Sequence, residues 1–244
     1  MNWPDAPRPL PTVDRAQMEE IDRTMVDDLG IELLQMMENA GANLARFARE
    51  HFGPAHVLVA AGTGGNGGGG LVAARHLHNA GIRVSVVTTR PADAYRGVPA
   101  HQLGTLEHMG LGVGDSMPTP GPEAPPIDLI IDAVIGYALD GQASGRAAQL
   151  IDAVGELGAP ILSLDTPSGV DVSTGEALGA HIRATATLTL ALPKTGLVGC
   201  RLAGEHFLAD ISVPADLYAE IGAVAGADVA PIFRDGPILR VRAA

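Results

Sequence analysis

Two aspartates stand directly after strongly apolar runs. Asp132 follows Leu129-Ile130-Ile131, and Asp165 follows Ile161-Leu162-Ser163-Leu164 and opens the turn Asp165-Thr166-Pro167-Ser168-Gly169. A strand-end aspartate often only caps the next turn through its own backbone, and that interpretation stays open for either residue alone. In the second turn, proline and glycine restrict the backbone and so give Asp165 and Ser168 defined directions. Carboxylate and hydroxyl oxygens of this kind can bind a hard cation or move a proton.

A run of glycines carries a third polar group. From Gly62 to Gly70 every residue except Thr63 and Asn66 is glycine, and the run lies between the apolar segment 56–61 and a helix-like segment at 70–80. A glycine loop between a strand and a helix offers unpaired N–H groups and the positive end of the helix dipole to phosphate oxygens. The sequence therefore predicts an anion-binding loop, with the Asn66 amide as an additional oxygen donor.

The same loop matches a dinucleotide fingerprint, Gly62-x-Gly64-x-x-Gly67, so an ordinary NAD(P)-dependent oxidoreductase is an alternative. That fingerprint normally opens the domain, whereas helix-like sequence fills residues 12–52 here. The second strand also ends at Thr88-Thr89-Arg90, without the acid that binds a ribose hydroxyl. A Walker loop is excluded because no Lys-Ser or Lys-Thr pair follows the glycines.

Strand-like and helix-like segments alternate along most of the chain. Strands are expected at 56–61, 83–89, 128–134, 160–165, 186–192 and 206–212, and helices at 70–80, 98–109 and 144–157, after two N-terminal helices that Gly30 separates. This alternation predicts an α/β fold with a doubly wound, mainly parallel sheet and an N-terminal helical extension. We expect a single domain, 1–244, with a helical extension at 12–52, a Rossmann-like core at 55–214 and a C-terminal tail at 215–244. Ligands in such sheets bind at the carboxyl ends of the strands, so Asn66, Asp132 and Asp165 should share one rim.

Composition restricts the range of partners. The formal net charge is −12, which disfavours broad binding to nucleic acid. Cys200 is the only cysteine, so no intrachain disulfide can form, and the eight histidines show no zinc-like spacing. Neither a signal peptide nor a membrane-spanning run is expected, and we predict a cytoplasmic protein. Lys194 is the only lysine, for which a structural role after a strand is the simpler interpretation.

Five short segments carry a family resemblance. They are Met37-Glu38-Asn39-Ala40-Gly41, the glycines of 64–70 with Asn66, Asp132-Ala133-Val134-Ile135-Gly136, Asp165-Thr166-Pro167-Ser168-Gly169 and Pro193-Lys194-Thr195-Gly196. In this order, within residues 12–214, the chain resembles the NAD(P)H-hydrate epimerase family, the YjeF N-terminal domain type. The resemblance implies a three-layer Rossmann-like fold, often dimeric, and an isomerase that interconverts the C6 epimers of hydrated NADH and NADPH in metabolite repair.

The resemblance also implies roles for individual residues. Asn66, Asp132 and Ser168 would ligate a potassium ion, and Asp165 would be the acid–base residue. Nucleotide contacts would come from Asp165 and from two segments, namely Gly65, Asn66, Gly67, Gly68 and Gly69, and Gly136, Tyr137, Ala138, Leu139, Asp140, Gly141 and Gln142. A homodimer formed through the N-terminal helices is expected from the same resemblance and from the wide apolar stripe on those helices.

The chain departs from the family pattern in the glycine loop. Gly69 stands where the family has an aspartate, Gly65 where it has an asparagine, and no lysine occurs at 90–97. Side chains at positions 65 and 69 would be expected to face the ligand, and one lost polar contact in a closed site costs about 1–3 kcal/mol. Two alternatives therefore remain: an enzyme of the same fold redirected to another small molecule, and a non-catalytic binding or scaffold protein. Retention of the cation and acid residues argues against the scaffold.

Overall fold

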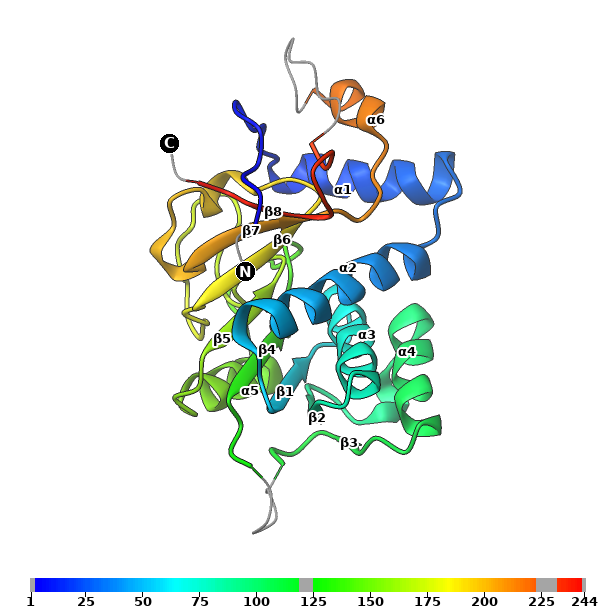
Figure 1. Ribbon diagram of the computed structural model, residues 1–244, viewed down its shortest axis with the longest axis vertical. Coiled ribbons are helices and arrows are strands. Elements are labelled where there is room, and N and C mark those ends of the chain that lie inside the picture. Colours follow the sequence, from blue (N-terminus) through cyan, green and yellow to red (C-terminus); the bar gives the residue numbers. More distant parts are fainter. Residues whose placement is uncertain (1–2, 119–124, 223–231, 243–244) are drawn as a thin grey trace.

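An eight-stranded sheet forms the centre of the molecule (Figure 1). The computed structural model describes residues 3–118, 125–222 and 232–242. The strand order is β3-β2-β1-β4-β5-β6-β7-β8, in which every neighbouring pair from β3 to β7 is parallel and β8 runs antiparallel to β7. The expected α/β class with a mainly parallel sheet is confirmed.

The strands follow the apolar runs of the sequence. They are β1 (His56–Ala61), β2 (Arg83–Thr88), β3 (Val113–Gly114), β4 (Leu129–Ala133), β5 (Ile161–Leu164), β6 (Ala186–Leu190), β7 (Glu205–Ala209) and β8 (Ile238–Arg240). The six expected strands are present, although β6 and β7 end earlier than predicted. The sequence did not indicate β3 and β8, because strands of two and three residues are too short for a periodic pattern.

Six α-helices accompany the sheet within the described residues. They are α1 (Arg15–Arg23), α2 (Leu33–Phe47), α3 (Gly65–Asn79), α4 (Gly97–His108), α5 (Gly145–Gly155) and α6 (Ala215–Glu220), and single π-helical turns extend α1 to Asp28 and α2 to Phe52. Asp14 caps α1 by accepting a hydrogen bond from the Gln17 backbone N–H at 2.8 Å, and the Gln17 side chain accepts one from the Asp14 N–H at 3.0 Å. Gly30, with φ +67°, allows the chain to turn between α1 and α2.

The prediction that the glycine run is a loop up to about residue 70 was wrong. Helix α3 begins at Gly65, so most of the glycines form its first two turns. A Cβ on Gly67 would lie 1.8 Å from the Gly62 carbonyl oxygen, and one on Gly70 would lie 2.5 Å from the Ala133 Cβ. The glycines thus allow α3 to pack against the ends of β1 and β4, and this packing outweighs their low helix propensity.

The helices cover both faces of the sheet. Helices α2, α3 and α4 pack on one face, where Phe47, Leu71 and Leu103 join side chains of β1, β4 and β5 in one core (Figure 1). Helix α5 packs on the other face through Leu150, Ile151 and Val154, against the alternate residues of β1 and β4. Helices α1 and α6 contribute to a third core beside β7 and β8. These layers fit the predicted three-layer arrangement.

The C-terminal segment is more than a tail. Within 215–244, helix α6 and strand β8 are both ordered parts of the domain, and β8 completes one edge of the sheet. The N-terminal residues bind to that strand: the Ala6 N–H donates to the Arg240 carbonyl at 2.9 Å, and the Arg240 N–H donates to the Pro4 carbonyl at 2.7 Å. The two ends of the chain therefore stabilise each other.

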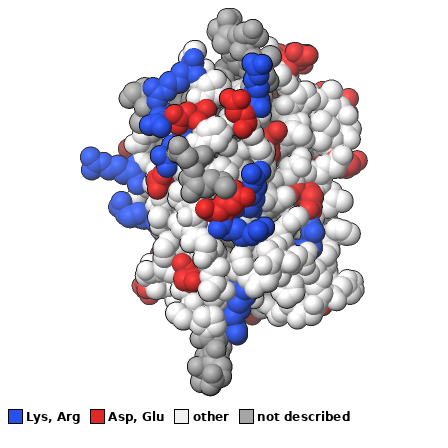
Figure 2. Space-filling model, in the orientation of Figure 1, with Lys and Arg blue, Asp and Glu red and all other residues white. Residues whose placement is uncertain are grey.

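The strand order reverses beside β1. The chain passes from β1 to β2 and β3 on one side, and then returns to place β4 on the other side of β1. The loops after β1 and β4 consequently diverge, and this is the position where doubly wound sheets bind ligands. Across the described residues, no helix has the length and apolar character needed to cross a membrane. On the face seen in Figure 2, acidic and basic side chains lie next to one another rather than in a single basic stripe.

Candidate functional site

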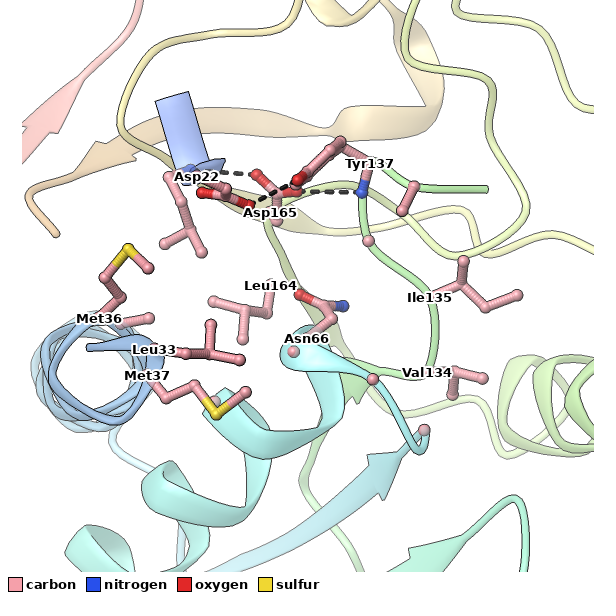
Figure 3. A pocket seen from close by; sticks show the side chains of 18 of the residues that line it. Asp22, Leu33, Met36, Met37, Asn66, Val134, Ile135, Tyr137, Leu164 and Asp165 are labelled. Atoms are coloured by element: carbon pink, nitrogen blue, oxygen red, sulfur yellow. Dashed lines mark hydrogen bonds between the residues drawn. The ribbon is translucent and has the colours of Figure 1, made fainter. Parts of the chain in front are cut away.

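A cavity of about 490 Å³ opens where the loops after β1 and β4 diverge. Its walls come from the end of α1, one side of α2, the start of α3 and the segments after β4 and β5 (Figure 3). The polar groups Asp22, Asn66, Tyr137 and Asp165 lie among apolar neighbours such as Met37 and Leu164. A largely apolar cavity with a few converging polar groups is typical of a site for a small organic ligand.

Asp165 is held in a strained turn at the end of β5. Its φ is +66°, and the Thr166 N–H donates to the Leu164 carbonyl at 2.8 Å, which closes a γ-turn around it. A γ-turn with a positive central φ is rare and strained, and such strain in a residue other than glycine is found mainly at functional sites. The turn directs the Asp165 carboxylate into the cavity while only 3% of the residue remains exposed.

Lys194 is the counter-ion of Asp165. Its ammonium group is fully buried and forms an ion pair with Asp165 Oδ1. It also donates to the Leu190 carbonyl at 2.9 Å. The backbone N–H groups of Tyr137 and Leu190 donate to the same carboxylate, at 3.1 and 3.3 Å. These contacts fix the position of the Asp165 carboxylate.

Asp132 and Ser168 are brought together, as the sequence predicted, but they lie below the cavity and not on its wall. Both residues are fully buried. Asp132 accepts hydrogen bonds from the Ser168 hydroxyl at 2.5 Å, from the Ser168 N–H at 2.8 Å and from the Ser163 hydroxyl at 2.8 Å. Burial raises the pKa of Asp132, against the lowering effect of these donors. The network ties the ends of β4 and β5 together.

Asn66 is the polar residue of the glycine run. Its side chain projects from the first turn of α3 into the cavity (Figure 3). Neither the oxygen nor the nitrogen of its buried amide has a hydrogen-bond partner among the residues that the structure describes. A buried, unpaired amide is costly, so it indicates a site for a bound ion, water or ligand atom. The amide lies close to Gly136, where a Cβ would be 3.3 Å from Asn66 Oδ1.

The predicted nucleotide contacts divide into two groups. Gly65, Asn66, Gly69, Gly136, Tyr137, Ala138 and Asp165 line the cavity, whereas Gly67, Gly68, Leu139, Asp140, Gly141 and Gln142 do not. Gly67 and Gly68 are buried against neighbouring backbone and Met37. The segment after Ala138 runs over the surface, where the Leu139 carbonyl accepts a hydrogen bond from Arg15 at 3.1 Å. A Cβ at Gly69 would lie 2.8 Å from Leu164 Cδ2, so a side chain there would have to displace that residue.

Two residues of the site were missed by sequence reasoning. Asp22 accepts a hydrogen bond from the Tyr137 hydroxyl at 2.5 Å, and Lys194 pairs with Asp165. Asp22 falls on the same helix face as Met18 and Met25, so an acid on the buried stripe of α1 was the available signal. For Lys194, the signal was its position as the only lysine, inside a family motif.

This fold and this site define a class of protein: a doubly wound α/β domain whose strand ends hold a buried aspartate–lysine pair and an unpaired amide around a small-molecule cavity. Within that class the chain belongs to the family described as YjeF-related protein N-terminus, which matches residues 33–196. This match confirms the resemblance seen in the sequence motifs.

Similar proteins agree with this assignment. The chain is 46% identical over 209 residues to an NAD(P)H-hydrate epimerase of Dehalogenimonas lykanthroporepellens, covering 84% of this chain and 83% of that protein. It is 36% identical over 208 residues to an NAD(P)H-hydrate epimerase of Truepera radiovictrix, covering 85% and 92%. The crystal structure of the yeast protein ynu0 has the same fold, with a TM-score of 0.78 at 24% identity over 95% of this chain and 100% of that one.

Proposed function

We propose that this chain is an NAD(P)H-hydrate epimerase, an isomerase that inverts the hydroxyl-bearing C6 carbon of hydrated NADH and NADPH. The observation that carries the proposal is the Asp165 carboxylate, which is directed into the cavity by a strained turn and held by Lys194 and two backbone donors. Relatives that carry this activity in their names and are covered over 83% and 92% of their length support the choice of substrate.

Asp165 is the proposed acid–base residue. Inversion at a carbon that bears a hydroxyl requires either that the hydroxyl leaves and returns or that the ring opens and closes, and a proton moves in both routes. A carboxylate within hydrogen-bond reach of the reacting group contributes roughly 10²–10⁴-fold to such a step. The apolar side chains that line the cavity, among them Leu164 and Ile211, would limit the access of water to the reacting ring.

A potassium ion is the proposed cofactor, with Asn66, Asp132 and Ser168 as its protein ligands. The donor types suit a hard cation, because they are amide, carboxylate and hydroxyl oxygens. To bind it, Asp132 and Ser168 would exchange their mutual hydrogen bond below the cavity for contacts with the ion. The unpaired Asn66 amide supports the assignment, since a cation would satisfy its buried oxygen. When bound, the ion would supply positive charge for the anionic groups of the nucleotide, while Asn66 and the start of α3 orient them.

Nucleotide binding is proposed to use the part of the predicted contact set that lines the cavity. At the start of α3, Gly65 leaves open space beside Met37, whose Cε would be 3.6 Å from an added Cβ, whereas Leu164 fills the space beside Gly69. The same feature favours the alternative of a redirected enzyme of this fold, because an apolar wall replaces two polar positions there. Both candidates use Asp165, and only the substrate separates them.

The first experiment is chiral chromatography of purified single-epimer hydrated NADH with and without the protein, in potassium and then in sodium buffer. We expect acceleration over the spontaneous rate, a further dependence on potassium, and a loss of roughly 10²–10⁴-fold for Asp165→Asn. A folded protein that gives no acceleration in either buffer would refute the epimerase proposal and direct the search to other small molecules.

A homodimer in the cytoplasm completes the proposal. Helix α2 and the turn before it expose Leu29, Leu33 and Leu34, which are 50%, 36% and 40% accessible. Exposed leucines on adjacent turns provide an apolar surface suited to a second copy of the chain. Light scattering at micromolar concentration is expected to give twice the monomer mass, and a monomer mass would contradict the dimer.

A further inference from the structure

A second carboxylate lies beside Asp165 at one end of the cavity. Asp22 comes from the last turn of α1, and its side chain points toward Tyr137 and Asp165 (Figure 3). Tyr137 connects the two acids directly. Its backbone N–H donates to Asp165 Oδ2 at 3.1 Å, and its hydroxyl donates to Asp22 Oδ2 at 2.5 Å. Tyr137 therefore contacts both carboxylates.

The two acids have different surroundings. Asp165 has an ion pair with Lys194 and backbone donors on both oxygens. Asp22 has the Tyr137 hydroxyl, and within the described part of the chain it forms no ion pair. The Lys194 ammonium group lies 5.9 Å from the centre of the Tyr137 ring, on the Asp165 side of the pair. Asp165 thus has a cation as its direct partner, whereas Asp22 has none among the described residues.

The charged groups around Asp22 reinforce this contrast. Burial raises the pKa of Asp22 above its ordinary value, and the negative charge of Asp165 acts in the same direction. The Tyr137 hydroxyl and the charge of Lys194 oppose the rise without cancelling it. Burial, with Asp22 next in importance, also raises the pKa of Tyr137. Two neighbouring acids in such different surroundings are the usual arrangement for an acid and a base.

We propose that Asp22 and the Tyr137 hydroxyl form a proton-donating arm that works opposite the proton-accepting Asp165, so that the site contains a matched acid and base. The proposal rests on the epimerase function argued above and assigns it a chemical route. If the hydroxyl leaves the substrate, a single acid that protonates its oxygen is enough. Opening of the ring needs a base at the hydroxyl and an acid at the ring nitrogen, which is the pair that the cavity holds.

The substrate class is a cyclic hemiaminal, in which the hydroxyl-bearing carbon is bonded to a ring nitrogen. Asp165 takes the hydroxyl proton, the O–H electron pair forms the carbonyl double bond, and the C–N pair moves to the nitrogen as that bond breaks. The Tyr137 hydroxyl turns from Asp22 Oδ2 to the ring nitrogen and gives the nitrogen its proton. The protonated Asp22 carboxyl then donates its own proton to the Tyr137 oxygen, which reverses the direction of their hydrogen bond. Rotation then presents the other carbonyl face, and the reverse transfers close the ring and return both protons.

The test measures kcat and KM for single-epimer hydrated NADH across pH in the wild type, Asp22→Asn and Tyr137→Phe. We expect each variant to lose roughly 10²–10⁴-fold in kcat with little change in KM. The alkaline limb of the kcat profile, which reports loss of the proton from the donor, should disappear in Asp22→Asn. Asp22→Glu should recover part of kcat, because it restores the proton.

Asp27→Asn is the matched control, because Asp27 is exposed in the same helical segment and the substitution is the same. It should behave as the wild type. If Asp22→Asn fails to fold in thermal unfolding, Tyr137→Phe alone tests the arm. Two results with an active wild type would overturn the proton-donating arm while leaving the epimerase function intact. One is a kcat within threefold of the wild-type value in both variants, and the other is an unchanged alkaline limb in Asp22→Asn. An inactive wild type would instead overturn the proposed function.

Discussion

Breaking the buried ion pair between Lys194 and Asp165 should strongly destabilise the fold. Lys194→Met keeps the volume of the side chain but leaves Asp165, 3% exposed, without its cation. Coulomb's law at an effective dielectric constant of about 20 gives about 5.5 kcal/mol for two unit charges about 3 Å apart. The two backbone donors to Asp165 remain in the variant and reduce the loss. We therefore expect the free energy of unfolding to fall by about 3–4 kcal/mol.

A double-mutant cycle tests the cause of this loss. Asp165→Asn alone strands the Lys194 ammonium group, which keeps the Leu190 carbonyl as a partner, and should also cost about 3 kcal/mol. The double variant buries no unpaired charge, so it should recover most of the stability while remaining inactive. Urea unfolding followed by circular dichroism measures all four proteins. In thermal scans, each single variant should melt about 10 °C below the wild type.

The exposed pair Asp5–Arg242, at 2.8 Å, is the control for this cycle. Both side chains are about half exposed, so Asp5→Asn with Arg242→Met should show no measurable coupling. Losses from Lys194→Met and Asp165→Asn that simply add in the double variant would refute the reasoning. Such a result would mean that the two side chains stabilise the fold by packing and not by their charges.

Three further perturbations test the packing and burial of the fold. Gly67→Ala places a Cβ 1.8 Å from the Gly62 carbonyl oxygen and should lower the free energy of unfolding in urea by about 3 kcal/mol or more. The control Gly65→Ala, whose Cβ would be 3.6 Å from its nearest neighbour, should be neutral or stabilising. Equal effects of the two substitutions would contradict the packing argument. The pKa of His206 is lowered from 6.5 to about 4, chiefly by burial. The unfolded chain therefore binds the proton more tightly than the folded chain, and the free energy of unfolding should fall as the pH drops from about 6.5 to about 4. At about 1.4 kcal/mol for each pH unit, the loss of stability approaches about 3 kcal/mol. A His206→Gln variant whose stability falls equally steeply toward acid pH would contradict this role of His206. Phe47→Ala removes a fully buried ring that lies 4.5 Å from Phe207 and should cost about 3–5 kcal/mol; a loss below about 1 kcal/mol would mean that the core closes over the cavity.

Most of the fold was predictable from local sequence. The runs at β1, β4 and β5 are mostly apolar on both faces, because both faces of a central parallel strand are buried, and that pattern needs no knowledge of partners. The short strands β3 and β8 were not predictable, because they exist only through pairing with β2 and β7. The start of α3 was misplaced for a related reason. Glycine disfavours helix locally, and only the close approach of neighbouring backbone makes it the required residue.

The candidate site divides in the same way. Asp165, Asn66 and Tyr137 were identified because they follow strands, lie in a glycine run or belong to a family motif. Their partners Asp22 and Lys194 were not identified. Asp22 precedes Asp165 by more than a hundred positions, and Lys194 lies in the segment after the next strand, β6. Proximity between such residues is a property of the sheet order, which no local pattern contains.

The sequence by itself determined the class of fold, the family and the rim where polar groups would gather. These depend on hydrophobic periodicity and on short motifs, which act over a few residues. The tertiary structure alone decided that Asp132 and Ser168 form a buried network below the cavity, that Lys194 neutralises Asp165, and that Tyr137 joins Asp165 to Asp22. Those contacts depend on burial and on which strand ends meet, so they are established only when the sheet has assembled.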